Sequence, residues 1–214
     1  MDPPECTGHS HDHDHTDDLG LSLRTYVDFA AVTCLNEEEK DSGKGVIKTH
    51  DERLSAYPNV QSPEDDPELL LFIPFTESVT IQTITIRDAT EGNQTAAPRR
   101  IKLFANREDI DFEMARDLPA QQEMELLPPH HFAEGTINYP LRPAGRFQNI
   151  SSLTIFVQSN YDDTGALGTS ISYVGLKGKG TRMKRRAVDT VYESQGMLED
   201  HKVNGNEYFS RSLI

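Results

Sequence analysis

The chain has 214 residues, 36% of them hydrophobic, and we expect one large β domain rather than two small domains. Its 35 acidic and 21 basic residues give a net charge of −14. A field of that sign repels nucleic acid and anionic membranes, so we expect neither as a partner. It favours basic partner surfaces and keeps a protein soluble.

Cysteine usage and the N-terminal sequence predict the compartment. Cys6 falls in a segment without a folding pattern, so we expect no disulfide between it and Cys34. The N-terminal residues are acidic and lack the apolar core of a signal peptide. The longest apolar run, Leu69–Ile73, is much too short to span a membrane. Reduced thiols without an export signal indicate a cytoplasmic and nuclear protein.

The first segment, residues 1–20, contains four of the eight histidines, six acidic residues and no lysine or arginine. This composition predicts a disordered tail. Its histidines occupy every second position: His9, His11, His13 and His15. Such a chain can hold Zn²⁺ or Ni²⁺ through imidazole nitrogen, although the spacing matches no closed four-ligand zinc site. The alternative is a solvated tail whose charge changes as the histidines protonate near neutral pH.

Residues 21–194 carry the pattern of one folded domain. Leu21–Leu35 predicts an irregular or partly helical lead-in, Glu37–Gly45 a solvated loop and Val46–Val60 an irregular segment. Asp109–Leu118 predicts a short helix or a loop. Short apolar runs, some alternating with polar residues, predict strands. These are Glu68–Phe75, Val79–Ile86, Arg100–Phe104, Gly135–Leu141, Leu153–Val157 and Ser170–Leu176, with a further candidate at Val188–Tyr192.

The order and phase of these strands predict the fold class. A corner at Pro74–Ser78 separates the first two strands. In the second, the apolar positions shift from Val79 and Ile81 to Ile84 and Ile86, which indicates a bulge or a strand buried on both faces. Many short strands without a βαβ rhythm predict an all-β fold, an antiparallel sandwich.

The last segment, residues 195–214, turns polar and is expected to form a flexible tail. Its terminal aromatic and aliphatic residues are candidates for contact with a partner protein: Tyr208, Phe209, Leu213 and Ile214. The alternative is a frayed chain end.

Two features suggest chemistry, and in both a structural interpretation is favoured. Acidic residues follow Cys34 closely and disfavour its thiolate, so we expect a buried structural thiol rather than a nucleophile. Asp163-Thr164-Gly165-Ala166 spells the aspartic-protease tetrapeptide, but that chemistry needs two such carboxylates and the chain has one copy. A turn in an acidic loop explains this segment better. We predict no catalytic residue, no cofactor and no enzyme activity.

A glycine-rich run and a basic cluster follow near the end of the domain. Gly175–Gly180 has neither phosphate-loop nor dinucleotide-binding spacing, and we interpret it as a strand exit. Arg182, Lys184, Arg185 and Arg186 could bind phosphate or act as a nuclear address. A solvated strand edge is favoured because the whole chain is strongly acidic.

Five blocks, in order, resemble the PITH domain family. They are Cys34–Glu37, Asp65–Phe75, Pro98–Asn106 with Asp111-Phe112 after it, Phe147–Asn160 and Ile171–Gly178. The resemblance covers about residues 22–192. It implies a jelly-roll sandwich like that of galactose-binding domains, in agreement with the strand pattern.

The resemblance also implies a function, that of a non-catalytic module that binds the 26S proteasome. Larger relatives carry a thioredoxin domain, which this chain lacks, and this puts a redox role in doubt. We expect a monomer whose acidic surface and tails recognise the regulatory particle. The alternative is a ligand- or carbohydrate-binding jelly roll, which the absence of tryptophan and the scarcity of loop aromatics disfavour.

Overall fold

The computed structural model describes residues 20–89, 96–128 and 136–184, with side chains described up to residue 180. Residues 1–19 of the predicted N-terminal tail, the predicted C-terminal tail and the candidate strand Val188–Tyr192 lie outside this part of the chain. The domain limits drawn from the sequence therefore stay predictions.

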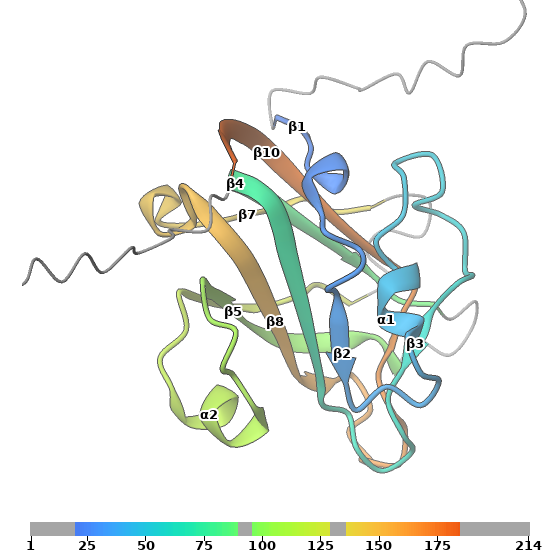
Figure 1. Cartoon of the computed structure of the whole chain (residues 1–214). Coiled ribbons are helices and arrows are strands. Elements are labelled where there is room, and N and C mark those ends of the chain that lie inside the picture. Colours follow the sequence, from blue (N-terminus) through green and yellow to red (C-terminus); the bar gives the residue numbers. More distant parts are fainter. Residues whose placement is uncertain (1–19, 90–95, 129–135, 185–214) are drawn as a thin grey trace, which may run out of the picture.

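One long strand, β4 (Leu69–Arg87), takes part in both layers of an antiparallel sandwich. Its first residues, 69–74, pair with β8 (Ile150–Asn160), and β2 (Thr33–Leu35) pairs on its other edge. Residues 79–87 pair with β10 (Tyr173–Lys184), and β7 (Tyr139–Pro140) joins there. Figure 1 shows β4 running between β8 and β2 before it continues beside β10.

The remaining strands extend these two layers. In the first layer, β5 (Pro98–Ala105) pairs with β8, and β6 (Gln122–Glu125) pairs with β5. In the second, β1 (Leu21–Ser22) pairs with β10. A separate two-stranded ladder joins β3 (Val60–Gln61) to β9 (Ser170–Ile171). All these pairs are antiparallel, and the predicted all-β jelly-roll sandwich is confirmed.

The helical elements are short: η1 (Arg24–Tyr26), α1 (Ser42–Gly45), α2 (Phe112–Asp117) and η4 (Ala144–Phe147). The Asp111 carboxylate caps α2 by accepting a hydrogen bond from the Met114 backbone N–H at 2.8 Å. This helix covers part of the outer face of the first layer, where its residue Ala115 lies in one apolar cluster with Phe104 and Phe156. Within the described residues, no helix is long and apolar enough to cross a membrane.

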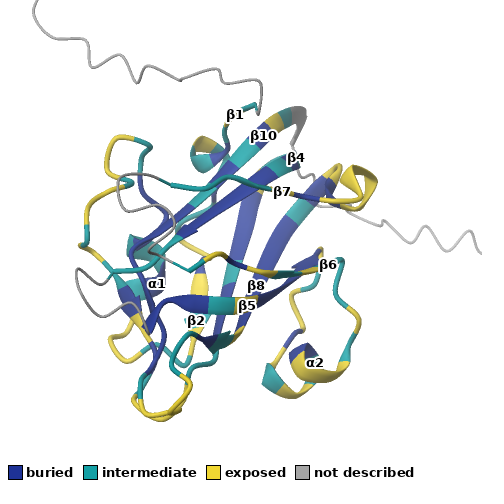
Figure 2. Ribbon diagram, turned by 180° about the vertical axis from the view of Figure 1, so that it is seen from behind, coloured by how far each residue is buried: buried dark blue, intermediate teal, exposed yellow. Residues whose placement is uncertain are grey.

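Between the two layers lies a core of aliphatic and aromatic side chains. Phe75, Phe147 and Leu153 are among its fully buried members, and Figure 2 shows the buried residues concentrated along β4, β8 and β10. Burial of each such side chain contributes about 1.5–3 kcal/mol of favourable transfer free energy. The sandwich is therefore held mainly by the facing surfaces of its two layers.

The predicted change of phase in the second half of β4 corresponds to a bulge. Lys177 of β10 pairs with Thr83, and the next residue, Gly178, pairs with Ile81, so Gln82 has no partner on that edge. This extra residue lets Ile81 and Ile84 both face the core, although they are three positions apart.

Several expected boundaries differ from the observed ones. The two strands predicted on either side of Pro74–Ser78 form one continuous strand, and the corner is where β4 exchanges partners. The short strands β1, β2, β3 and β6 were not predicted, because each is too short to show a clear alternation of apolar and polar residues. The predicted loop before Val46 ends in α1.

The glycine-rich segment was wrongly interpreted as a strand exit, because it lies inside β10. A Cβ atom on Gly178 would meet the Thr80 carbonyl oxygen at 1.9 Å, so only glycine fits opposite the bulge. The backbone of β4 cannot move away without breaking its pairing with both layers.

The substitution Gly178→Ala is expected to destabilise the fold by about 3 kcal/mol, because the added methyl group overpacks against the backbone of β4. The free energy of unfolding in urea measures the loss. Gly145→Ala is the control, because nothing lies within 4 Å of a Cβ there, and it should change stability by no more than about 0.5 kcal/mol. Equal stability of the two variants would contradict the close approach at Gly178.

Candidate functional site

Several candidate residues from the sequence lie outside the described residues. These are His9, His11, His13 and His15, the terminal residues Tyr208, Phe209, Leu213 and Ile214, and the basic residues Arg185 and Arg186. Their proposed roles in metal binding, partner contact and phosphate binding stay predictions. Among the described residues, no group of three or more His, Cys, Asp or Glu side chains is placed to hold a metal ion.

Cys34 lies in β2 against the α1 turn, where a Cβ added to Gly43 would meet the Cys34 Cβ at 2.5 Å. Burial, together with the nearby Glu37 carboxylate, raises the pKa of this thiol to about 12. A thiol with such a pKa carries almost no thiolate at neutral pH. The geometry therefore supports a structural thiol.

The residues after Cys34 tie three elements together. Asn36 has a positive φ of 65°, and its amide donates to the Asp66 carboxylate at 3.0 Å and to the Glu68 carbonyl oxygen at 2.8 Å. The Glu37 carboxylate accepts hydrogen bonds from the backbone N–H groups of Asp41 and Gly43 at 2.5 and 2.8 Å. This block joins β2 and α1 to the beginning of β4, so its role is architectural.

The protease-like tetrapeptide forms a turn, as expected. The preceding residue, Asp162, organises this turn, because its carboxylate accepts hydrogen bonds from the backbone N–H groups of Thr164, Ala166 and Leu167 at 2.8–3.0 Å. These bonds and the one from the Thr164 hydroxyl lower the pKa of Asp162. The Asp163 side chain is 93% exposed. An exposed carboxylate is not the buried, proton-sharing group that aspartic-protease chemistry requires.

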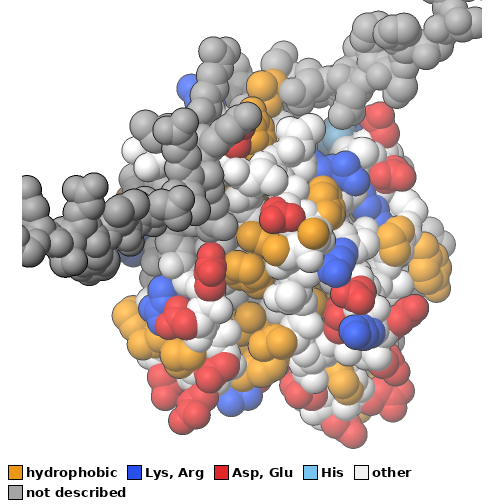
Figure 3. Space-filling view, viewed as in Figure 1, with side chains coloured by type: hydrophobic (Ala, Val, Ile, Leu, Met, Phe, Trp, Pro, Cys, Tyr) orange, Lys and Arg blue, Asp and Glu red, His pale blue; other side chains and the backbone are white. Residues whose placement is uncertain are grey.

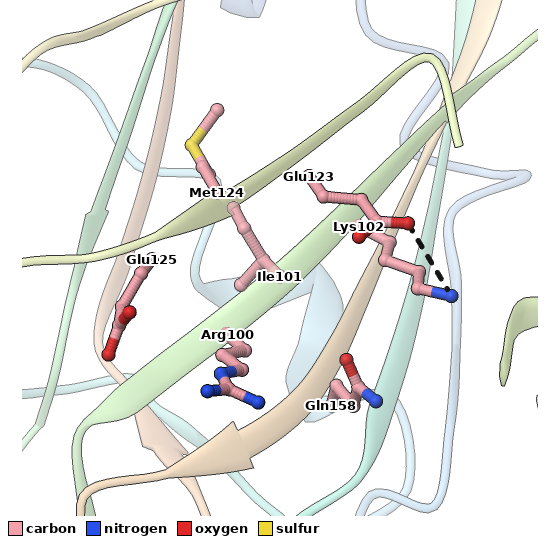
Figure 4. Close-up of a pocket in the computed structure, with 7 residues that line it drawn as sticks. All are labelled: Arg100, Ile101, Lys102, Glu123, Met124, Glu125 and Gln158. Atoms are coloured by element: carbon pink, nitrogen blue, oxygen red, sulfur yellow. Dashed lines mark ion pairs between the residues drawn. The ribbon is translucent and has the colours of Figure 1, made fainter. Parts of the chain in front are cut away.

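An open groove lies on the outer face of β8, β5 and β6, next to the part covered by α2. Its volume is about 460 Å³, and Figure 4 shows the residues that line it: Arg100, Ile101, Lys102, Glu123, Met124, Glu125 and Gln158. Charges of both signs face one another across β5 and β6, because Arg100 pairs in register with Glu125, and Lys102 with Glu123. The groove is thus a polar surface on regular strands.

The charged groups of the groove differ in the hydrogen bonds and ion pairs that they already form. The Lys102 ammonium is largely buried, donates to the Arg116 carbonyl oxygen at 2.7 Å and lies 3.7 Å from the Glu123 carboxylate. The Glu125 carboxylate accepts a hydrogen bond from Arg99 at 2.7 Å, which lowers its pKa. Arg100 is exposed. Because Glu125 is already bound by Arg99, Arg100 is the cation in this groove best placed for a partner's carboxylate.

This groove was not predicted, although its signal is in the sequence. Arg100 and Lys102 alternate with buried Ile101 and Leu103, while Glu123 and Glu125 alternate with Met124. Period-two alternation places each set on one face of its strand, but it does not show which strands are neighbours.

The fold and this surface define a class: an antiparallel β-sandwich of the kind used as a protein-interaction or ligand-binding module. The sequence also matches the model of the PITH domain over residues 13–196. The chain therefore belongs to the PITH domain family, and the resemblance found in its sequence is confirmed.

Relatives across eukaryotes support this assignment. The chain is 36% identical to PITH domain-containing protein 1 of Dictyostelium discoideum, an alignment that covers 92% of this chain and 93% of the relative. It is 34% identical to a PITH domain-containing protein of Drosophila melanogaster, covering 96% and 98%. It is 31% identical to PITH domain-containing protein 1 of Homo sapiens, covering 95% and 86%.

Solved structures with a similar arrangement include carbohydrate-binding modules. A family 32 module from C. perfringens NanJ, solved with galactose, has a TM-score of 0.49 and 11% identity, covering 72% of this chain and 96% of that one. An F5/8 type C domain from Bacteroides fragilis has a TM-score of 0.48 and 12% identity, covering 73% and 97%. Similarity at this level says nothing about a ligand of this chain.

The high pKa of Cys34 makes a testable prediction about its reactivity. In a Cys6→Ser variant, where Cys34 is the one remaining cysteine, alkylation by iodoacetamide at pH 7 should be at least about tenfold slower in the native protein than in urea, because burial raises the pKa of the native thiol and lowers its thiolate fraction. Mass spectrometry of timed samples measures both rates. Comparable native and unfolded rates would show that Cys34 is an accessible thiol.

Proposed function

We propose that this chain is a non-catalytic protein-interaction module that associates with the regulatory particle of the 26S proteasome. Membership of the PITH domain family carries the proposal, because the five sequence blocks resemble a family in which that association is expected. The proposal includes action as a monomer in the cytoplasm and the nucleus.

The outer groove supports the proposal by its form. It is open, and its charged side chains stand on paired strands, so the backbone that presents them is already ordered when a partner binds. Polar and charged groups in such a setting determine the choice of partner and the rate of association more than the affinity. The net charge of −14 adds attraction toward basic partner surfaces.

Ligand binding is the second candidate, and the volume of the groove is the observation that favours it. A volume of about 460 Å³ lies in the range of small-molecule sites. None of the residues that line the groove is aromatic, so it offers no flat platform for a sugar ring. If no glycan of a panel shifts the melting temperature of the protein, the carbohydrate version of this candidate is excluded.

Charge reversal in the groove should weaken the association with the proteasome. Arg100→Glu places three carboxylates on the outer face of β5 and β6, and we expect recovery of purified 26S particles on the immobilised protein to fall about tenfold. Lys40→Glu is the matched control, because Lys40 is exposed in the loop before α1 and the substitution changes the net charge by the same amount. A parallel loss in both variants would indicate a general charge effect, and unchanged recovery by Arg100→Glu would exclude the groove.

The C-terminal segment is tested separately by a chain that ends at residue 195. If its aromatic and aliphatic residues anchor the protein, removal should lower the recovery of 26S particles severalfold, since a few buried anchors carry most of the energy of an interface. Replacement of Tyr208, Phe209, Leu213 and Ile214 by serine in the full chain is the length-matched control. Unchanged recovery in both chains would remove this segment from the proposed interface.

A further inference from the structure

A second polar surface lies on the loop between α1 and β3. We call it the basic loop surface, and its residues are Arg24, Lys48, Arg53, Leu54, Tyr57 and Arg87. They come from η1, from the loop itself and from the end of β4. None of them belongs to the outer groove.

Its four cations donate to backbone carbonyl oxygens. The Arg24 Nε donates to the Ile47 oxygen at 3.0 Å, and the Lys48 Nζ to the Ser55 oxygen at 2.9 Å. Arg53 donates to the His50 oxygen at 2.9 Å. Arg87 donates to the Arg53 oxygen at 3.4 Å.

This pattern contrasts with cations elsewhere in the domain. Arg99 and Arg107 each bind a carboxylate at 2.7 Å, and Arg116 binds Glu68. Within the described residues, no carboxylate forms an ion pair with any of the four cations of the basic loop surface. Carbonyl oxygens hold these cations in place without neutralising them. Lys48 is buried, whereas Arg24, Arg53 and Arg87 are partly exposed and can act on a partner.

Two acidic residues share the loop and reduce the local positive charge. The Glu52 carboxylate accepts a hydrogen bond from the Thr49 hydroxyl at 2.8 Å, which lowers its pKa, and Asp51 is exposed. The Lys48 side chain is nearly buried, and this burial lowers its pKa, with Arg87 adding repulsion and Glu52 opposing both. Because Lys48 is buried and the Glu52 carboxylate attracts both Arg24 and Lys48, the positive charge open to a partner is that of Arg53 and Arg87.

Two exposed apolar side chains stand beside these charges. Leu54 is 44% exposed and Tyr57 is 78% exposed, the largest fraction among the exposed large hydrophobic side chains of the described residues. The bond from Lys48 to Ser55 and the bond of the Ser55 hydroxyl to the Tyr57 oxygen at 2.6 Å hold the loop that presents them. Figure 3 shows Lys and Arg side chains together with a few acidic ones at the upper right, where this loop lies in Figure 1, and further acidic ones along the lower edge.

We infer that the basic loop surface docks an acidic segment of a partner protein that carries apolar side chains. Carboxylates of the segment pair with Arg53 and Arg87, and an aliphatic side chain packs between Leu54 and Tyr57. A short segment fits better than nucleic acid or an anionic membrane, because the total charge of −14 repels an extended polyanion or a charged surface more than it repels a short segment. This inference is independent of the proposed association with the proteasome.

The test uses the full chain and a fluorescein-labelled peptide of Glu-Glu-Leu repeats, followed by fluorescence anisotropy. The peptide should bind, and binding should weaken as salt is raised, because exposed charges are screened. Peptides of Glu-Glu-Ser and Lys-Lys-Leu repeats separate the contribution of the apolar contact from that of charge. Each should bind at least about tenfold more weakly than the Glu-Glu-Leu peptide.

Variants assign the binding to this surface. Arg53→Glu and Tyr57→Ser should each weaken binding of the Glu-Glu-Leu peptide about tenfold, through lost charge and lost apolar contact respectively. Lys40→Glu, in the loop before α1, is the charge-matched control and should bind like the unaltered chain. Circular dichroism checks that each variant is folded.

Four outcomes would overturn the inference. They are no binding of the Glu-Glu-Leu peptide, equal binding of the Lys-Lys-Leu peptide, an equal effect of Lys40→Glu, and tighter binding of single-stranded DNA or of phosphatidylserine vesicles. The last would assign the surface to polyanions in place of an acidic protein segment.

Discussion

The shared strand β4 is the constraint on which the rest of the structure depends. Its first residues pair with β8 and its later residues with β10, so one backbone fixes the position of both layers. The core forms between these layers, and the bulge at Gln82 keeps the side chains of β4 directed into it. Gly178 is needed for the same reason, because the backbone of β4 approaches too closely for any side chain there.

The Cys34–Glu37 block shows how a conspicuous sequence motif serves architecture. Its thiol lies against α1, its asparagine binds the beginning of β4, and its glutamate caps α1. All three roles are local hydrogen bonds or close packing that join elements distant in the sequence. The Cys34–Glu37 block therefore holds α1 and the loop around it against the sandwich, although its cysteine was a candidate for chemistry.

Charge distribution separates the two candidate surfaces. In the outer groove, Lys102 pairs with Glu123 and Arg99 binds Glu125, which leaves Arg100 for a carboxylate of a partner. On the basic loop surface, carbonyl oxygens hold the cations, and no carboxylate of the described residues forms an ion pair with Arg53 or Arg87. An acidic chain can in this way attract basic partners over long distances and still offer one local site to an acidic segment.

The sequence by itself determined the all-β class, the positions of the longer strands and the change of phase in β4, because these follow from local alternation of apolar and polar residues, whereas the pairing with β10 decided that the change of phase is a bulge. It also identified the family. Only the tertiary structure decided that β4 serves both layers, that Arg100 faces Glu125, and that Arg24, Lys48, Arg53 and Arg87 meet on one surface. Those features depend on which distant strands and loops pack together, and period-two alternation contains no information about pairing partners.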